Sequence, residues 1–279
     1  MNWKPVLALA LLVHPVAVQC AAQNLRAELA DLFTSGVQAQ KSGQLDAAEK
    51  AFLQVLRQGG KVAFVYNNLG IIYQQRGDHA RAIPQFRQAL RLQADYVPPR
   101  ILLAASLLAV GKIPEATSEA EQAVKLEPRE PLARLQLARC YERAGKPLEA
   151  VDQLEALREM APSEPEYAYQ LGKSYLNLGA WCFQQIKQLQ PDSARLYQIY
   201  GENYYVQGAV ELAISSYRRA AAVDPSLEGI HLALARIYQA QGKAAEALRE
   251  IELELAIVPE SVATLALKRV IAAKEPRPQ

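Results

Sequence analysis

Cysteine, histidine and an excess of charge of either sign are all scarce in this sequence of 279 residues. Three cysteines and three histidines, with no Cys-x-x-Cys spacing, leave little material for a metal centre and argue against a disulfide scaffold. Lys and Arg number 31 against 29 Asp and Glu, a balance that argues against a nucleic-acid partner. No Walker, Gly-x-Ser-x-Gly, His-Glu-x-x-His or Gly-x-Gly-x-x-Gly motif occurs. We therefore expect a protein that is not an enzyme, holds no metal or cofactor and takes no small-molecule substrate.

Residues 1–22 differ in composition from the rest of the chain. Lys4 is their only charged residue, an apolar run broken by a proline follows it, and small residues stand from Cys20 to Ala22. This order predicts a secretory signal peptide, cleaved after Ala22 or alternatively after Cys20. The run is short of the ~20 apolar residues of a membrane span. We therefore expect an exported, periplasmic or extracellular protein, associated with a membrane only if Cys20 is lipidated or the leader stays uncleaved.

Glycine recurs along the chain at a constant spacing, which is broken once by a shorter step between Gly179 and Gly208. An alanine follows most of these glycines at one fixed distance, and a proline follows several of them at another, as Ala82 follows Gly77 and Pro128 follows Gly111. Three residue types held in phase over most of the sequence indicate an internal repeat. The glycines of the series are Gly43, Gly77, Gly111, Gly145, Gly179, Gly208 and Gly242.

Each repeat has the pattern of two amphipathic helices. Before the glycine, small and large apolar residues follow a helical stripe, as in Tyr66, Leu69, Gly70 and Tyr73. A glycine just past the stripe can adopt the left-handed conformation that closes a helix. A second stripe follows, and the proline ends it. Because neither helix can bury its stripe alone, neighbouring hairpins are expected to stack.

This pattern resembles the tetratricopeptide repeat, a helix–turn–helix unit of about 34 residues. The resemblance covers about 29–261, with repeats 1 to 7 starting near 29, 63, 97, 131, 165, 194 and 228. It implies an all-α fold, a right-handed α-solenoid of stacked hairpins with a C-terminal capping helix. The expected organisation is a signal peptide at 1–22, repeats 1–4 at 23–164, an irregular repeat 5 at 165–193, repeats 6–7 at 194–261, and the capping helix and tail at 262–279.

Repeat 5 lacks five residues, and they fall in the turn between its two helices. Two alternatives follow: a very tight turn at 177–179, or one long helix over 167–189. The absence of proline from this stretch favours the long helix. That helix would act as a joint between repeats 1–4 and repeats 6–7.

The first helices of such a solenoid line a concave groove. Tyrosine side chains in the groove supply contact area, while amide and charged side chains determine the register of a bound segment. The partner expected is therefore a protein, bound through a peptide segment or a helix. The candidate groove residues are Asn67, Gln74, Arg139, Arg143, Tyr169, Lys173, Gln198, Glu202, Tyr205 and Arg236.

The resemblance implies a non-catalytic scaffold or assembly adaptor. The alternative is an accessory subunit of an envelope enzyme or transport complex, docking by its outer face or its ends. Some tetratricopeptide domains clamp a carboxylate with Lys, Asn and Arg side chains. Asn68 matches that pattern, but Phe33, Val37, Pro98 and Leu102 stand where basic residues belong, so we expect no clamp in repeats 1–3.

The remaining reactive side chains have structural explanations. Cys140 and Cys182 are expected either to be small buried hydrophobes or to form a bridge in an oxidising compartment. His231 stands at a core position of repeat 7, whereas His79 starts a second helix at a solvated position.

Overall fold

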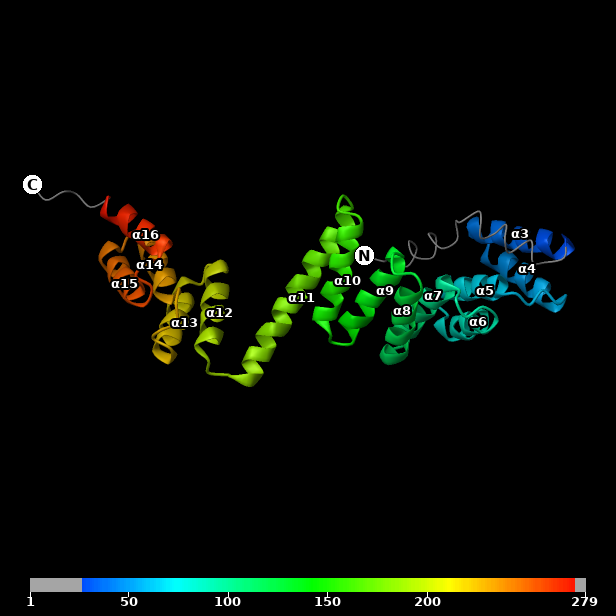
Figure 1. Cartoon of the computed structure of the whole chain (residues 1–279), viewed down its shortest axis with the longest axis horizontal. Helices are drawn as coiled ribbons and strands as arrows, with labels where there is room; N and C mark the ends of the chain where they lie inside the picture. Colours follow the sequence, from blue (N-terminus) through cyan, green and yellow to red (C-terminus); the bar gives the residue numbers. More distant parts are fainter. Residues whose placement is uncertain (1–26, 274–279) are drawn as a thin grey trace, which may run out of the picture. The chain divides into compact units, whose positions relative to one another are not determined.

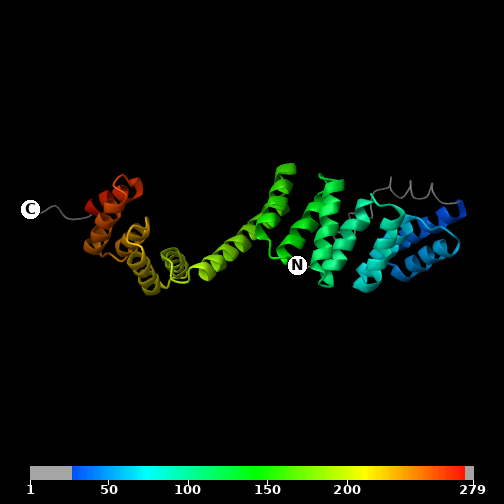
Figure 2. The same ribbon diagram turned by 60° about the horizontal axis from the view of Figure 1, so that its bottom comes forward.

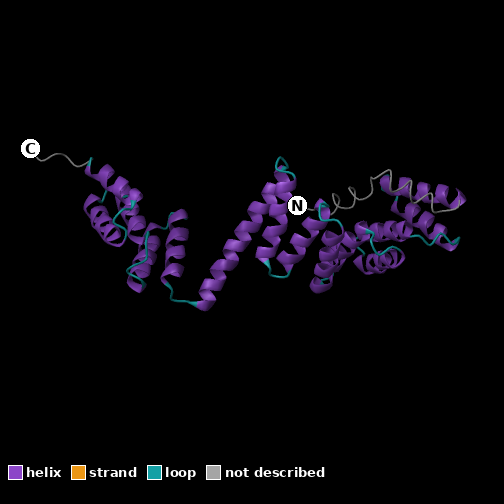
Figure 3. Ribbon diagram, viewed as in Figure 1, coloured by secondary structure: helices purple, strands orange, loops and turns teal. Residues whose placement is uncertain are grey.

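Fourteen helices and no strand make up residues 27–273, the part of the chain that this computed structural model describes (Figures 1 and 3). The predicted leader and the end of the tail lie outside these described residues. The chain divides into two compact units, an N-terminal unit that ends at Leu178 and a C-terminal unit that begins at Gly179. Each unit has a hydrophobic core of its own.

The N-terminal unit consists of successive antiparallel hairpins, which Figure 2 shows following one another in order along the chain. Second helices pack against the first helix of the next hairpin, as α6 does against α7. Its helices are α3 (Ala27–Lys41), α4 (Leu45–Arg57), α5 (Ala63–Gln75), α6 (His79–Leu92), α7 (Val97–Ala109), α8 (Ile113–Leu126), α9 (Pro131–Arg143), α10 (Pro147–Met160) and the beginning of α11 (Pro165–Leu189).

The C-terminal unit contains the end of α11, two complete hairpins and a final single helix. That last helix packs on both helices of the preceding hairpin and buries Ile271, as the predicted capping helix should. The remaining helices of this unit are α12 (Ala194–Val206), α13 (Val210–Val223), α14 (Ile230–Ala240), α15 (Ala244–Ile257) and α16 (Val262–Ala272).

The periodic glycines close the first helix of each hairpin. Gly77, for example, has a φ of 76°, in the left-handed region that costs other residues steric strain. Its N–H donates to the Gln74 carbonyl over 2.9 Å, and the Asp78 N–H donates to the Tyr73 carbonyl over 2.8 Å. Gly43, Gly111, Gly145, Gly208 and Gly242 adopt the same positive φ. Gly179 is the member of the series that does not.

Within a hairpin, the two helices meet where a small residue on the first faces a larger one on the second. A β-carbon added to Gly70 would lie 2.5 Å from Cε1 of Phe86, so the ring occupies the space that a side chain would need. The pairs Gly36 with Phe52 and Gly201 with Tyr217 repeat this arrangement at the same separation along the sequence.

The other complete hairpins use a different pair at the same two positions. Their first helices carry alanine and their second helices an aliphatic residue, in the pairs Ala104 with Ala120, Ala138 with Leu154, and Ala235 with Ile251. A glycine at this position therefore accompanies an aromatic ring, and an alanine accompanies a smaller side chain. We call the glycine position the socket of its hairpin.

Helix α11 is the exception to the hairpin pattern. It runs without interruption from Pro165 to Leu189, over 25 residues, so the long helix is the alternative that the structure adopts for repeat 5 (Figure 1). The boundary between the two units falls inside this helix, after Leu178. Only Leu171 and Ser174 are buried along its length among the residues described.

Candidate binding surfaces

The first helices of the N-terminal hairpins form one row, because α3 contacts α5, α5 contacts α7 and α7 contacts α9. This row is the surface on which the sequence predicts the groove. The side chains on this surface differ in solvent exposure, and those of repeats 2 and 3 differ in this respect from those of repeats 4 and 5.

Two of the predicted groove residues, Asn67 and Gln74, are on α5 of repeat 2 and take part in packing within the N-terminal unit. The Gln74 amide nitrogen donates to the Leu102 carbonyl over 3.2 Å and to the Ser106 hydroxyl over 2.9 Å, which ties α5 to α7. Asn67 is 4% exposed, and its Oδ1 has no hydrogen-bond partner within residues 27–273. Neither side chain stands open to a partner as the sequence-based groove requires, and their part in binding stays a prediction.

Asn68, the residue that matches a carboxylate clamp, is used within its own helix. Its amide nitrogen donates to the Phe64 carbonyl over 2.8 Å. Phe33, Val37 and Leu102 are buried in the apolar core around it. The inner row of repeats 1–3 is therefore an apolar wall with few free donors for a partner's carboxylate.

Repeats 4 and 5 present a different surface, which we call the basic surface: Arg139 and Arg143 on α9, and Tyr169 and Lys173 on α11. Leu135 on α9 and Leu171 on α11 belong to one apolar cluster, to which α10 also contributes. Arg143, Tyr169 and Lys173 are exposed, and Tyr169 is 66% exposed. Exposed apolar area thus adjoins positive charge.

Arg139 is the half-buried end of the basic surface. Burial lowers the pKa of its guanidinium below the usual value, while the nearby carboxylates of Glu142 and Glu166 act in the opposite direction. A lowered arginine pKa still leaves the group charged at neutral pH, but it shows that the charge is poorly solvated. A partly desolvated cation gains more from an approaching anion than an exposed one does.

The C-terminal unit carries the remaining predicted groove residues, which we call the mixed surface: Gln198, Glu202 and Tyr205 on α12, and Arg236 on α14. Gln198 accepts a hydrogen bond from Arg195 Nη1 over 2.8 Å. Glu202, Tyr205 and Arg236 are exposed. The structure thus places one acidic, one aromatic and one basic side chain on the first helices of repeats 6 and 7.

The mixed surface borders the core of repeat 6. Burial raises the pKa of Tyr217 to about 12, and the neighbouring Glu202 and Tyr205 add to the rise. Tyr217 is the ring that fills the Gly201 socket, so the hydroxyl end of a core residue lies near this surface. Its hydroxyl therefore stays protonated at physiological pH.

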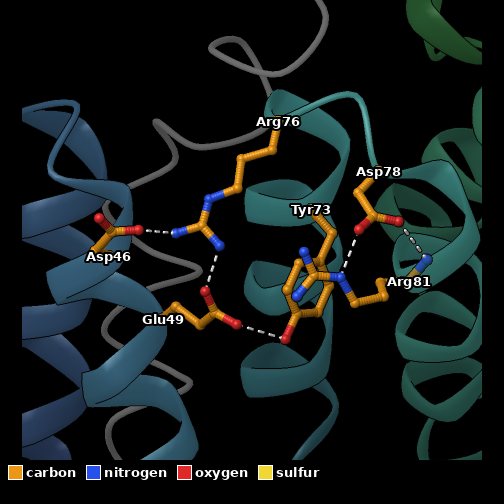
Figure 4. A network of polar contacts seen from close by, with 6 residues as sticks. All are labelled: Asp46, Glu49, Tyr73, Arg76, Asp78 and Arg81. Atoms are coloured by element: carbon orange, nitrogen blue, oxygen red, sulfur yellow. Dashed lines mark hydrogen bonds and ion pairs between the residues drawn. The ribbon is translucent and has the colours of Figure 1, made fainter.

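A polar network joins repeats 1 and 2, and sequence reasoning did not find it (Figure 4). Arg76 at the end of α5 pairs with Glu49 and Asp46 on α4. The Tyr73 hydroxyl donates to the second oxygen of Glu49 over 2.8 Å, and the Arg81 guanidinium lies over the Tyr73 ring at 4.6 Å. Figure 4 shows Arg76 and Tyr73 reaching from α5 to α4, with Arg81 of α6 over the Tyr73 ring, so the network holds two hairpins together.

A repeated sequence signal underlies part of this network. The tyrosine at the same place in later repeats also donates to a glutamate of the preceding second helix: Tyr141 to Glu121 over 3.0 Å, and Tyr175 to Glu155. A tyrosine one turn after the socket, with a glutamate on the second helix of the repeat before it, could have been read from the sequence. This contact is structural rather than a binding site.

Cys140 and His231 play structural parts, whereas Cys182 is exposed rather than the buried hydrophobe expected of an unbridged cysteine, and His79 is half-buried rather than solvated. Cys140 and Cys182 are both free, so they do not form the bridge that was one alternative. Burial raises the pKa of the Cys140 thiol to about 11, which makes it unreactive at neutral pH. His231 is half-buried, and its Nδ1 lies 2.7 Å from Glu250 on α15. Residues 27–273 contain no group of three metal-ligating side chains, and none of their helices is long and apolar enough to cross a membrane.

Comparisons with known families agree with this fold. Two models described as tetratricopeptide repeat match residues 28–95 and 107–173, and a third, described as TPR repeat, matches residues 201–242. These matches fall in both units and leave α11 mostly uncovered. No curated protein sequence is significantly similar to the chain.

Solved structures of tetratricopeptide proteins resemble the chain at low identity. A tetratricopeptide repeat protein from Parabacteroides merdae is 14% identical, covers 88% of this chain and 100% of its own, and has a TM-score of 0.49. Pseudomonas aeruginosa pilF is 14% identical over 93% of this chain and 100% of its own, with a TM-score of 0.47. YrrB, described as a TPR protein with an unusual peptide-binding site, is 16% identical over 80% of this chain and 100% of its own, with a TM-score of 0.42.

The TM-scores and the identities of all three are low, so these structures carry no argument about what this chain binds. The family rests instead on the three matching models, the helical hairpins and the glycines that close them. Repeats of this kind generally mediate contacts between proteins. The chain is therefore a tetratricopeptide repeat protein.

Proposed function

We propose that the chain is a non-catalytic scaffold or assembly adaptor that holds a segment of a partner protein on its basic surface. The observation that carries this proposal is the exposure of Tyr169, Arg143 and Lys173 on two neighbouring first helices. A large exposed aromatic side chain beside two cations suits a segment with an apolar residue flanked by carboxylates.

The charges around Tyr169 favour one orientation of that segment. Arg143 and Lys173 offer exposed cations, whereas Glu142 and Glu166 lie near the half-buried Arg139. A partner's carboxylates would be attracted to the exposed cations and repelled from the glutamates. The mixed surface of the C-terminal unit, which carries an acid and a base besides Tyr205, offers a second contact of the same kind.

The site of action that we propose is the cell envelope or the exterior of the cell. It rests on the signal-peptide pattern of residues 1–22, and cleavage after Ala22 would release the chain. Mass spectrometry of the N-terminus of protein isolated from the native host tests this directly. A mature N-terminus at Ala21 or Gln23 is expected, whereas Met1 retained in a cytoplasmic fraction would contradict export.

The experiment for the binding surface uses site-specific photocrosslinking in the native host. A photoreactive amino acid replaces Tyr169, and crosslinked partner peptides are identified by mass spectrometry. We expect defined peptides rich in Asp and Glu, and at least a tenfold lower yield when Lys173→Glu is added, because the added carboxylate repels them. Lys173→Ala should give an intermediate yield.

A second function, docking by the outer face, is tested in the same experiment. Leu212 on α13 is 53% exposed on a second helix and takes the same photoreactive residue. The pair Lys125→Ala and Leu126→Ala on α8 removes an exposed cation and exposed apolar area from a second helix, and it is the control for Lys173→Ala with the photoreactive residue kept at position 169. Capture at position 212 with none at 169, or equal loss from the α8 pair, would contradict binding on the basic surface.

A further inference from the structure

Helix α11 carries both halves of one hairpin but no turn between them. In repeat 2 eight residues separate Tyr73 from Ala82, the last stripe residue of the first helix and the first of the second. In repeat 5 only three residues separate the corresponding Tyr175 and Gly179. The chain therefore continues as one helix where other repeats turn back.

The socket of repeat 5 is empty in the single chain. Gly172 occupies the position of Gly36, Gly70 and Gly201, yet a β-carbon added to it would meet no atom within 4 Å. The ring that should fill it is Phe183, which follows its glycine more closely than the other rings do because five residues are missing. The stretch of helix from Gly172 to Phe183 spans about 16 Å, so Phe183 cannot reach Gly172 of its own chain.

The contact residues of both halves share one face of α11. They follow one another at steps of four, three, four, four and three residues, which is the spacing of a straight stripe on a helix. These six residues, which we call the α11 stripe, are Ala168, Gly172, Tyr175, Gly179, Phe183 and Ile186. The first four are exposed and the last two half-buried.

We propose that two copies of this chain pair through their α11 stripes, antiparallel and about a two-fold axis near residue 177. Gly172 of each copy then receives the Phe183 ring of the other. Tyr175 faces Gly179, and Ala168 faces Ile186, as first and second helices meet in the other hairpins. A two-fold contact of this kind is self-complementary, since each half of one helix meets the opposite half of the second.

The missing turn explains why the partner is a second copy. A second copy of this chain supplies both halves in matching register, with Gly172 and Phe183 on the same helix at the required spacing. Exchange of identical elements between copies is favoured when the connecting loop is too short to fold back. The Phe183 ring is likewise incompletely packed in the single chain. It is half-buried against Tyr200, whereas the corresponding rings of other repeats, Phe52 and Phe86, are fully buried.

Sedimentation velocity of the full chain, at micromolar concentrations, tests the pairing. We expect the mass of two chains for the unchanged protein and of one chain for Gly172→Gln, because the new side chain fills the socket. Gly172 is exposed, a β-carbon there meets no atom within 4 Å, and the substitution replaces a helical glycine by a better helix former, so the far-UV circular dichroism should be retained. Asn177→Gln, exposed and half a turn away from the stripe, is the matched control and should leave the dimer intact.

A second variant tests the missing turn. Inserting five residues, including a glycine, between Leu178 and Gly179 restores the length of the other repeats, so each chain can fill its own socket. We expect this variant to be a monomer. The proposal is overturned if the unchanged chain sediments as one chain, if Gly172→Gln raises the dissociation constant less than about tenfold, or if the insertion variant remains a dimer.

Discussion

The socket gives a prediction that can be worked out in free energy. In the structure a β-carbon on Gly70 would lie 2.5 Å from Cε1 of Phe86 and 2.7 Å from its Cδ1. The ring is fully buried, so it has no free space into which to move. Overpacking of this kind costs about 2–3 kcal/mol. Alanine gains about 1 kcal/mol over glycine in a helix, so Gly70→Ala should destabilise the fold by about 1–2 kcal/mol.

The same substitution should change sign when the ring is replaced. Repeat 4 pairs Ala138 with Leu154, and the double substitution Gly70→Ala with Phe86→Leu copies that pair into repeat 2. In the Phe86→Leu background the clash disappears and the helix gain of about 1 kcal/mol remains. The coupling between the two substitutions should therefore reach about 2–3 kcal/mol, within the range that contacting residues show in double-mutant cycles.

Urea unfolding of the four proteins, followed by far-UV circular dichroism, measures the cycle. Because repeat arrays do not always unfold in one step, hydrogen exchange of the α5 and α6 amides localises the effect. An equal change in stability for Gly70→Ala in both backgrounds would refute the steric argument.

Three further outcomes follow from packing and charge. Ala213 is fully buried between helices, so Ala213→Arg should cost several kcal/mol by thermal melting, and a variant that melts like the parent would contradict the assigned phase of repeat 6. Burial raises the pKa of Glu49, but the hydrogen bonds from Arg76 and Tyr73 and the nearby positive charges together lower it by more. The net pKa therefore lies below the usual 4.5. The resulting stabilisation is fully present above the unfolded pKa of 4.5 and is lost as the pH falls through the lower folded pKa, so the melting temperatures of wild type and Glu49→Gln should converge as the pH falls below about 4.5. Glu254 is 2% exposed and accepts the N–H groups of Gly229 and Leu232 over 2.7 and 3.1 Å, so Glu254→Ala should cost about 2–4 kcal/mol in urea unfolding, and a loss below about 1 kcal/mol would contradict its capping role.

The hairpins were predictable because their signals are local. A glycine such as Gly77 must adopt a positive φ to close a helix, and the small Ala82 must sit against the first helix. These requirements act within one repeat and recur in phase, so the all-α tetratricopeptide fold follows from the sequence. The pairing of glycine sockets with rings, as in Gly70 and Phe86, is equally local and is visible once the structure identifies the contact.

The state of individual groove residues was less predictable because it depends on neighbouring repeats. Gln74 was predicted to face a partner, but the next hairpin supplies Ser106 and a backbone carbonyl within reach of its amide. Arg76 and Asp46 belong to different repeats, and only the stacking of α4 against α5 shows that they meet. Exposure of Tyr169 and Lys173, by contrast, agrees with their predicted positions on the first helix of repeat 5.

Repeat 5 shows the limit of a pattern that fits two conformations. Its residues match a first helix up to Tyr175 and a second helix from Gly179, and no residue between them forbids a helix. The choice depends on whether a three-residue connection can turn, which is a matter of backbone geometry. The structure resolves it in favour of one helix, with the stripe and the empty socket as consequences.

The central claim is that repeat 5 is one continuous helix rather than a closed hairpin. Spin labels at Tyr169→Cys and Lys187→Cys, in a Cys182→Ser background and diluted with unlabelled chain, measure it by electron–electron double resonance. Both positions are exposed, and the helix between them places their α-carbons about 27 Å apart. A distance of about 27 Å is the predicted result. A distance of about 10 Å, as in two packed antiparallel helices, would contradict the account.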